Sequence, residues 1–312
     1  MNVKSAVHFR RLPRKRYKFE RIRFCRRCGS YTTLWGDSCL SCQHKSTYTG
    51  LRDVAHALNK RLSRSSLMWV GVLVSIAVFT ARNLTELIIA LVIGISFLLG
   101  YAYIIRQFSS DVEQYRLQKI LHKETDIILV GLHKDLEQAE IDLQASRYKD
   151  AYEKLREISQ LIDNNALRLN KIKCLQHFIL RKDMELELSS LLPDTFDKNF
   201  TSYLLDVIRL QPQLVNRAVI EYVILYKEQI LLLPYGRELL VHVASSAMLV
   251  KGYLLPFHNF IHYLVPELHR ESLLRLCRQI TAEPEKYPEL VIRVKNAIKL
   301  KYEYDPEFQG LF

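Results

Sequence analysis

"RFCRRCGSYTTLWGDSCLSC", residues 23–42, decides how the N-terminal part of this 312-residue chain folds. It holds four of the chain's six cysteines as two C-x-x-C pairs, Cys25 with Cys28 and Cys39 with Cys42. Each pair fits a tight turn, and two such turns supply four thiolates for one tetrahedral ion. Four sulfur ligands favour zinc, and a closed shell of four leaves no position open for catalysis. We therefore predict a structural zinc centre at these four cysteines.

The pattern around the two pairs resembles the short zinc ribbons found at the ends of bacterial membrane proteins, of the form C-x-x-C-G…C-x-x-C. The resemblance covers residues 24–45 and includes Gly29, which fits the left-handed turn that follows the first pair. It departs after the second pair, where such ribbons frequently carry another glycine and this chain has Gln43. A segment this short usually needs a metal to be stable, so we assign residues 23–48 to a zinc ribbon. Rubredoxin-like or iron–sulfur iron and a thiol redox pair are the alternatives.

Positive charge is concentrated at the N-terminus. Residues 1–64 carry 16 Lys and Arg against three acidic residues, whereas the remaining 248 residues carry 29 basic and 30 acidic side chains. Aromatic residues alternate with the cations in and after the basic arm, residues 1–22: Phe9, Tyr17, Phe19 and Phe24. Such a segment can contact anionic lipid headgroups and set membrane topology, bind nucleic acid, or bind an acidic protein. We favour lipid and topology because an apolar region follows.

That apolar region, residues 65–105, predicts a two-helix transmembrane hairpin. Residues 65–81 and 87–105 are uncharged runs of 17 and 19 residues, within or near the length that crosses about 30 Å of hydrocarbon at about 1.5 Å per residue. The polar stretch "RNLTE", residues 82–86, lies between them as a tight turn. Trp69, Tyr101 and Tyr103 lie near the ends of the runs, as interfacial aromatics do. A buried hairpin in a soluble bundle is the alternative.

The flanking charges predict the orientation of the hairpin. Residues 49–64 have apolar side chains at helical spacing and basic residues between them, which predicts an amphipathic basic linker helix at the interface. Residues 1–64 carry a net charge of +13, whereas the turn offers only Arg82 against Glu86. The positive-inside rule then places both termini in the cytoplasm. Some 60 polar, basic residues precede the first apolar run, so we expect no secretory signal and a reducing compartment where thiolates bind metal.

Residues 109–312 predict a mainly α-helical cytoplasmic domain, because apolar residues recur three and four apart and prolines separate the segments. Within residues 125–165, the segment "ASRYKDAYEKLREISQLIDNN" resembles the second helix of a tetratricopeptide repeat. Tyr148, Ala151, Leu155 and Ile158 occupy the matching positions. The glycine that usually precedes the aromatic residue is absent, and no second copy follows at a period near 34. We therefore expect helical hairpins stacked into an α-solenoid-like body.

Catalytic motifs are sparse in the sequence. It contains no phosphate-binding loop, dinucleotide fingerprint or nucleophile elbow. His258 and His262 lie four residues apart but lack the glutamate of a zincin helix, so a packed pair is the favoured interpretation. Cys174 and Cys277 fall on apolar helical faces and are expected to be buried thiols. An enzyme site around these histidines and His242 remains a weaker alternative.

The sequence as a whole predicts a mainly α, two-span membrane protein with its zinc ribbon and helical domain on the cytoplasmic side. We expect a non-catalytic scaffold or regulatory adaptor, with a protein partner on the helical domain and anionic lipid at the membrane. The alternatives are a membrane-tethered nucleic-acid-binding protein and an enzyme with its site in the helical body. The oligomeric state is left open, because Gly94 and Gly100 are six apart and form no G-x-x-x-G motif.

Overall fold

The computed structural model describes residues 4–45, 48–80, 84–250, 252–309 and 311. It is mainly helical, with 66% of the residues in helices, which confirms the mainly α part of the predicted fold class. Contacts divide the chain into two compact units, and each is built from separate stretches of sequence. The ribbon unit comprises Arg11–Ala145 and Lys154–Ile162. The C-terminal unit comprises Met1–Arg10, Ser146–Glu153 and Asp163–Phe312.

A small antiparallel sheet lies at the start of the ribbon unit. Its strands are β1 (Arg23–Cys25), β2 (Tyr31–Thr32) and β3 (Tyr48–Gly50), in the order β2-β1-β3, and a 3-10 turn, η1 (Lys18–Arg21), precedes them. Phe24 pairs with Tyr31 on one side and with Thr49 on the other. The first helix begins directly after β3, so the ribbon and this helix are continuous.

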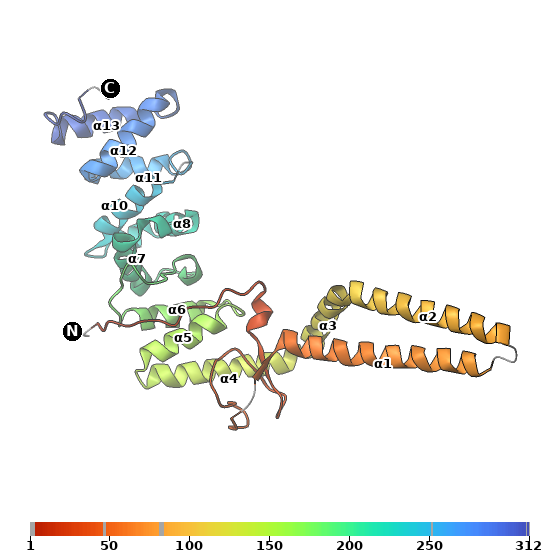
Figure 1. Cartoon of the computed structure of the whole chain (residues 1–312). Coiled ribbons are helices and arrows are strands. Elements are labelled where there is room, and N and C mark those ends of the chain that lie inside the picture. The colour runs from red at the N-terminus through yellow and green to blue at the C-terminus, as the bar shows by residue number, and fades with distance from the viewer. Residues whose placement is uncertain (1–3, 46–47, 81–83, 251, 310, 312) are drawn as a thin grey trace. The chain divides into compact units, whose positions relative to one another are not determined.

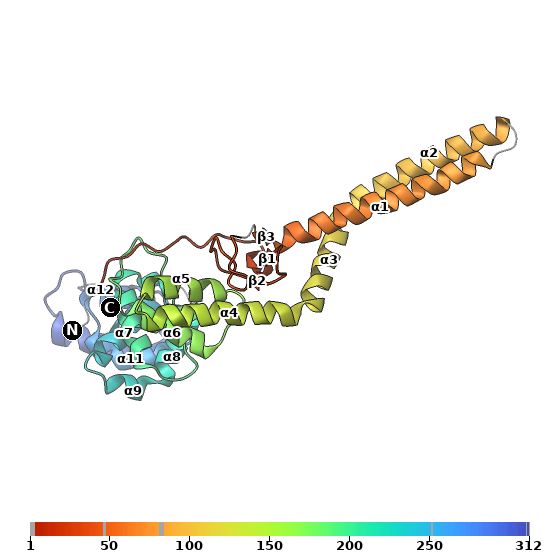
Figure 2. The ribbon, with the colours of Figure 1, turned by 90° about the horizontal axis from the view of Figure 1, so that it is seen from below.

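Two long helices follow the sheet and lie side by side in opposite directions, as both Figure 1 and Figure 2 show. They are α1 (Leu51–Phe79) and α2 (Leu84–Gln107). The single helix α1 contains residues 51–64 of the predicted linker helix, whose first two residues belong to β3, and most of the first apolar run. Gly94 of α2 lies against Val74 of α1 so closely that a Cβ atom there would come within 2.5 Å of Val74 Cγ1. The predicted turn starts at residues 82–83, outside the described residues.

Within the described residues, Glu86–Gln107 is the segment long and apolar enough to cross a membrane. Many large apolar side chains of both helices face outward. On α1, Trp69 and Leu73 are 69% and 66% exposed; on α2, Ile93 and Leu99 are 64% and 67% exposed. Such continuous apolar surface is unusual for a helix pair in water.

The ribbon unit is completed by α3 (Ser109–Lys123), α4 (Thr125–Gln144) and the end of α5 (Tyr148–Ile158). Its core joins the N-terminal segment, α1 and α4, which contribute the buried side chains Ile22, Tyr31, Leu51, Ile128 and Leu132, and residues of α3 pack against it. Phe19 and Phe24 pack against the same core and are partly buried. The ribbon is therefore part of a larger folded body and not a separate module.

The C-terminal unit is a series of short helices, each of which packs against helices close to it along the chain (Figure 1). After the first part of α5 come α6 (Asn165–Leu175), α7 (Lys198–Leu210), α8 (Arg217–Leu225), α9 (Lys227–Leu231), α10 (Gly236–Ala247), α11 (His258–Leu264), α12 (Arg270–Ala282) and α13 (Pro288–Lys301). Four 3-10 turns lie between them: η2 (Ser189–Leu191), η3 (Pro212–Leu214), η4 (Val265–Glu267) and η5 (Pro284–Lys286). Pro212, Pro266 and Pro284 lie in the first turns of the last three, where a missing N–H costs no hydrogen bond.

The helical hairpin predicted around residues 125–165 corresponds to α4 and α5. Ser146, between the two helices, takes a left-handed conformation with φ of +59°. Ala151, Leu155 and Ile158 of α5 are fully or almost fully buried, as the spacing predicts. Tyr148 stacks on His177, with ring centroids 3.6 Å apart. The tetratricopeptide likeness itself stays a prediction.

The first residues of the basic arm belong to the C-terminal unit. Ser5 forms an isolated parallel bridge with Phe178, and its N–H donates to His177 O at 2.9 Å. The Phe9 ring lies 4.7 Å from the Tyr152 ring and 5.3 Å from the Phe178 ring. Phe9 is thus used for packing within the chain.

Candidate metal centre

The two C-x-x-C pairs form two turns with the same backbone hydrogen bonds. In the first turn, Gly29 N–H donates to Cys25 O and Cys25 N–H donates to Ser30 O, both at 2.9 Å. In the second, Gln43 N–H donates to Cys39 O at 2.7 Å and Cys39 N–H donates to His44 O at 3.0 Å. The repeated pattern presents the cysteine side chains of both turns in the same way, so two copies of one local structure converge on one point.

Both turns contain a residue in the left-handed region one position after the second cysteine. Gly29 has φ of +74° and Gln43 has φ of +56°. Glycine adopts this conformation without steric cost, whereas other L-residues lose about 1–2 kcal/mol there. The departure from the ribbon pattern at Gln43 therefore changes the identity of the residue but not the geometry of the turn.

The four thiols meet within bonding reach of a single ion. Their sulfur atoms all lie within 4.8 Å of one another. Cys25 Sγ lies 4.0 Å from Cys42 Sγ, and Cys28 Sγ lies 3.6 Å from Cys39 Sγ. These distances are close to the edge of a tetrahedron of sulfurs around zinc, about 3.8 Å for a Zn–S bond of about 2.3 Å. They are far longer than a disulfide bond of about 2.05 Å. The donor set and its spacing thus fit a tetrahedral metal centre.

Electrostatics give a second reason to place a cation among these sulfurs. Burial disfavours the Cys39 thiolate, but hydrogen bonds from Ser30 and from backbone N–H groups of its own turn lower the pKa of Cys39 to about 5. The His44 N–H favours the Cys42 thiolate, yet desolvation and the three neighbouring sulfurs raise the pKa of Cys42 to about 11. Four thiolates this close together repel one another, so full deprotonation requires a metal ion.

A buried carboxylate on α4 holds the ribbon in place. Asp135 is fully buried and accepts three hydrogen bonds from the residues at the end of β2. Thr32 Oγ1 donates to Asp135 Oδ1 at 2.6 Å, and Thr33 donates to Oδ2 from its N–H at 2.7 Å and from its Oγ1 at 3.0 Å. Burial raises the pKa of Asp135, and these hydrogen bonds oppose that shift. Buried carboxylates need such donors, so the ribbon and α4 stabilise each other.

Close backbone contact adds to this attachment. An ideal Cβ atom on Gly131 would lie 2.2 Å from Tyr31 O, so α4 meets β2 at a position where only glycine fits. The Tyr31 hydroxyl donates to Glu124, and burial raises the pKa of Tyr31 above the ordinary value for tyrosine. The sequence did not single out Asp135, Gly131 or Glu124, because their partners lie about a hundred residues away and leave no local pattern.

Two of the cations near the ribbon, Arg21 and Arg52, are paired with carboxylates of the chain. Arg21 Nη1 lies 2.6 Å from Glu157 Oε2, and both side chains are about nine-tenths buried. Arg52 lies between two carboxylates, with Nη1 3.5 Å from Glu20 and Nε 3.4 Å from Glu113. Part of the basic charge of the N-terminal segment therefore serves the fold and is not available to a partner.

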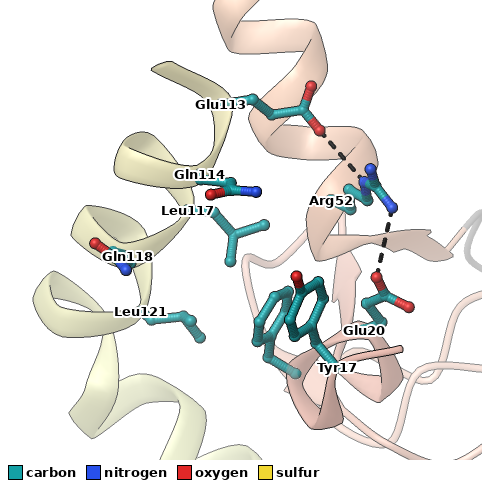
Figure 3. A pocket seen from close by; sticks show the side chains of 9 residues that line it. Tyr17, Glu20, Arg52, Glu113, Gln114, Leu117, Gln118 and Leu121 are labelled. Atoms are coloured by element: carbon teal, nitrogen blue, oxygen red, sulfur yellow. Dashed lines mark hydrogen bonds and ion pairs between the residues drawn. The ribbon is translucent and has the colours of Figure 1, made fainter. Parts of the chain in front are cut away.

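Arg52 also lies on the rim of a cleft of about 210 Å³ (Figure 3). The stacked rings of Tyr17 and Phe19, 5.2 Å apart, form one wall, and Leu117 of α3 contributes apolar surface opposite. Glu20 and Glu113 point toward the guanidinium group from two sides, as Figure 3 shows. Because Arg52 pairs with both carboxylates, the cleft is an apolar recess with a charge-compensated rim.

The remaining candidate residues do not form a second centre. Within the described residues, the four cysteines are the group of three or more possible ligands that lies within metal-binding distance. His258 Nδ1 lies 2.9 Å from the Leu255 carbonyl oxygen, and the His242 ring is 5.8 Å from that of His269. Cys174 and Cys277 are fully buried, as predicted, and burial raises their pKa values to about 12 and about 11.

Comparison of the chain with protein-family models, curated proteins and solved structures gave no match.

Proposed function

We propose that this protein is a membrane-anchored, non-catalytic scaffold that presents a structural zinc ribbon and a helical interaction body on the cytoplasmic side. One observation carries the proposal. The ribbon, which precedes the apolar helices α1 and α2, is hydrogen-bonded through Thr32 and Thr33 to Asp135, which follows them. The chain thus leaves a folded base, runs out along two apolar helices and returns to the same base.

This connection constrains how α1 and α2 can meet a membrane. If the chain crossed the bilayer once between residues 51 and 107, the ribbon and α4 would lie on opposite sides and their hydrogen bonds could not form. An even number of crossings keeps them together. Two helices of 29 and 24 residues would supply two crossings at about 1.5 Å per residue. Of these, α2 holds the segment that, among the described residues, is long and apolar enough to cross a membrane, and α1 exposes further apolar side chains. The geometry therefore supports the two-span hairpin over a single span.

The zinc ion has a structural role in this proposal. Cys25, Cys28, Cys39 and Cys42 would hold it, and the closed shell of sulfurs would leave it no catalytic position. Bound zinc would fix the two turns, and through β2 it would fix the surface that packs on α4. The metal then takes the place of the apolar core that a ribbon of this size lacks.

The C-terminal unit is the part we assign to protein binding. Its helices pack against others close to them along the chain, as in α-solenoids, and such bodies offer extended surfaces to partners. Its side chains are near neutral overall, in contrast to the basic N-terminal segment. The tetratricopeptide-like hairpin at α4 and α5 would begin this series.

The metal part of the proposal is tested by zinc content. Full-length protein purified in detergent should contain one zinc per chain, and a Cys25→Ser, Cys28→Ser double variant should contain none. Cys174→Ser, which alters a buried thiol outside the cluster, is the matched control and should keep the zinc. Zinc that survives in the double variant, or a second metal ion per chain, would contradict the proposal.

The membrane part is tested by topology. In inverted vesicles that expose the cytoplasmic face, tags at the N- and C-terminus should both be cleaved by added protease, whereas a tag between α1 and α2 should be protected. Protection of one terminus alone would show a single crossing. Extraction of the protein by alkaline carbonate would show that it does not span the bilayer.

The charge of the N-terminal segment favours nucleic acid as a second candidate partner. The packing of Phe9, Phe19 and Phe24 counts against base stacking, and Tyr17, 41% exposed, is stacked on Phe19. Binding of single-stranded RNA or DNA that weakens steeply with salt, and is lost when arginines 10–27 are neutralised, would favour this alternative.

A further inference from the structure

A cleft lies at the base of the two long helices, separate from the ribbon and from the cleft of Figure 3. It has a volume of about 410 Å³ and is bounded by α1, α2 and α3. Polar side chains line one part of it: Asn59, Ser63, Ser109 and Arg116. Apolar side chains line another part: Leu62, Ile105 and Phe108. A single small cleft thus offers two chemically different surfaces.

Asn59, Ser109 and Arg116 lie at the folded base, and Leu62 and Ile105 lie about one turn farther out along the hairpin. Asn59 Nδ2 donates to Ser109 O at 3.3 Å, which fixes these two residues at the same level. Because α1 runs away from this level and α2 returns to it, Ser66 and Tyr101 lie farther out along the hairpin. The Arg116 end of the cleft therefore lies at the base of the hairpin, and the apolar side chains of Leu62 and Ile105 lead outward from it.

Cations around this cleft lack acidic partners. Arg116 Nη1 donates to Leu58 O at 3.2 Å but forms no ion pair in the described part of the chain. The same holds, among the described residues, for the other basic side chains near the base of the hairpin: Lys60, Arg61, Arg64, Arg106 and Lys119. In contrast, Arg21 and Arg52 near the ribbon are paired with glutamates. The base of the hairpin therefore has uncompensated positive charge.

We propose that this cleft binds one anionic phospholipid, with its phosphate at Arg116 and the polar residues beside it and an acyl chain along Leu62, Ile105 and Phe108. This inference rests on the proposed insertion of α1 and α2 in a membrane. Inorganic phosphate would leave the apolar lining unused, and a zwitterionic lipid would leave the cations uncompensated. An anionic lipid matches both surfaces at once.

Native mass spectrometry of the detergent-purified full-length protein tests the site. Dioleoylphosphatidylglycerol should bind to the delipidated protein as one retained molecule per chain, and dioleoylphosphatidylcholine should bind more weakly. Arg116→Gln should weaken phosphatidylglycerol binding about tenfold, the effect of losing one charge-assisted hydrogen bond. Lys119→Gln, which removes a cation from the same helix without lining the cleft, should change it less than about twofold. Ser63→Leu, which fills the cleft, should also abolish retention.

Several results would overturn the inference. Wild-type affinity in both Arg116→Gln and Ser63→Leu would place the lipid elsewhere, and equal binding of phosphatidylcholine would remove the role of the charge. Displacement of the lipid by millimolar inorganic phosphate would assign the cleft to free phosphate. Flotation with liposomes separates this inference from the proposed function. If the wild-type protein floats with the liposomes but the variants keep wild-type lipid affinity, only the lipid site is disproved. If the wild-type protein does not float, the membrane anchor is disproved as well.

Discussion

Gln43 and Gly29 illustrate how single residues set the geometry of the candidate metal centre. Both lie in the left-handed region at equivalent positions of two matching turns, yet only one is glycine. The four cysteines and Gly29 could be recognised from spacing alone, because a C-x-x-C pair and the glycine after it form one local turn. That Gln43 takes the same conformation could not, since nothing in its side chain favours φ above zero.

Substitutions at these two positions should have opposite effects on zinc affinity. We expect Gln43→Gly to bind zinc at least as tightly as the wild type, because it relieves a conformation that disfavours a side chain. Gly29→Ala should weaken zinc binding by about 1 kcal/mol for the opposite reason, since the space around Gly29 is open and only the backbone is strained. Competition with a chromogenic chelator measures both. Equal effects of the two substitutions would contradict the assigned turn geometry.

Asp135 is expected to be a main determinant of ribbon docking. Asp135→Ala leaves Thr32 and Thr33 with unsatisfied donors in a buried site, so it should lower the free energy of unfolding by about 2–4 kcal/mol. Glu140→Ala, at an exposed position of the same helix, is the matched control and should change it by less than about 0.5 kcal/mol. Thermal unfolding in detergent followed by tryptophan fluorescence measures both. No difference between the variants would show that the carboxylate does not hold the ribbon.

At the scale of elements, the helices themselves could be predicted from apolar periodicity, but their continuity could not. The boundary expected between a linker helix and a first span falls inside α1, because "SRSS" contains no glycine or proline and does not end a helix. Which faces of α1 and α2 meet also escaped prediction. The contact is made at Gly94, where the absence of a side chain lets the two helices approach closely. The sequence alone does not show which residue of the other helix lies opposite a glycine.

The α1–α2 contact predicts a difference between two glycines of the same helix. A Cβ atom at position 94 would clash with Val74, so Gly94→Ala should separate the helices and lower the melting temperature. No atom lies within 4 Å of the corresponding point at Gly100, so Gly100→Ala should be neutral or stabilising through its higher helix propensity. Thermal stability in detergent distinguishes them. A Gly94→Ala variant as stable as Gly100→Ala would disprove the close approach.

A salt bridge in the C-terminal unit predicts a pH-dependent contribution to stability. Arg270 Nε and Nη2 donate to the two carboxylate oxygens of Asp305 at 2.6 and 2.9 Å, which lowers the pKa of Asp305 below its usual 3.8. A lowered pKa in the folded state means that the stabilisation is present above pH 3.8 and is lost as the pH falls through the folded-state value.

Melting curves of the wild type and Asp305→Asn measured against pH check this sign. Their difference should be constant from pH 7 to about pH 5 and should shrink at lower pH as Asp305 becomes protonated. Any effect of acid on the cysteine cluster is the same in the wild type and in Asp305→Asn, so it cancels when their melting temperatures are subtracted. A gap that widens on acidification would contradict the assignment.

At the scale of the whole molecule, the division into two units follows long-range contacts and not the order of the sequence. The basic arm was assigned to an external partner because its composition is basic and aromatic. The structure instead uses Phe9 for packing against Tyr152 and Phe178. Composition predicts that a segment has a partner, but it cannot tell a partner in another molecule from one elsewhere in the same chain.

Removal of the metal should therefore have a local effect within one unit. Chelation is expected to increase hydrogen exchange of backbone amides in residues 23–50 and in α4 around Gly131 and Asp135, because the ribbon is the element packed on that part of α4. Helices α10 and α12 of the C-terminal unit should keep their protection. Hydrogen–deuterium exchange with mass spectrometry reads both regions in one experiment, and loss of protection throughout the chain would show that the units unfold together.

The distance along the chain between the ribbon and its support has a consequence for biosynthesis. Thr32 and Asp135 are separated by 103 residues, so at about 5–20 residues per second the ribbon leaves the ribosome roughly 5–20 s before α4 does. During that interval the two long apolar helices are also being made. A ribbon that binds its ion early would be folded and resistant to proteases before its docking helix is synthesised. The supply of metal during translation would then decide whether the nascent chain is ready when its docking helix arrives.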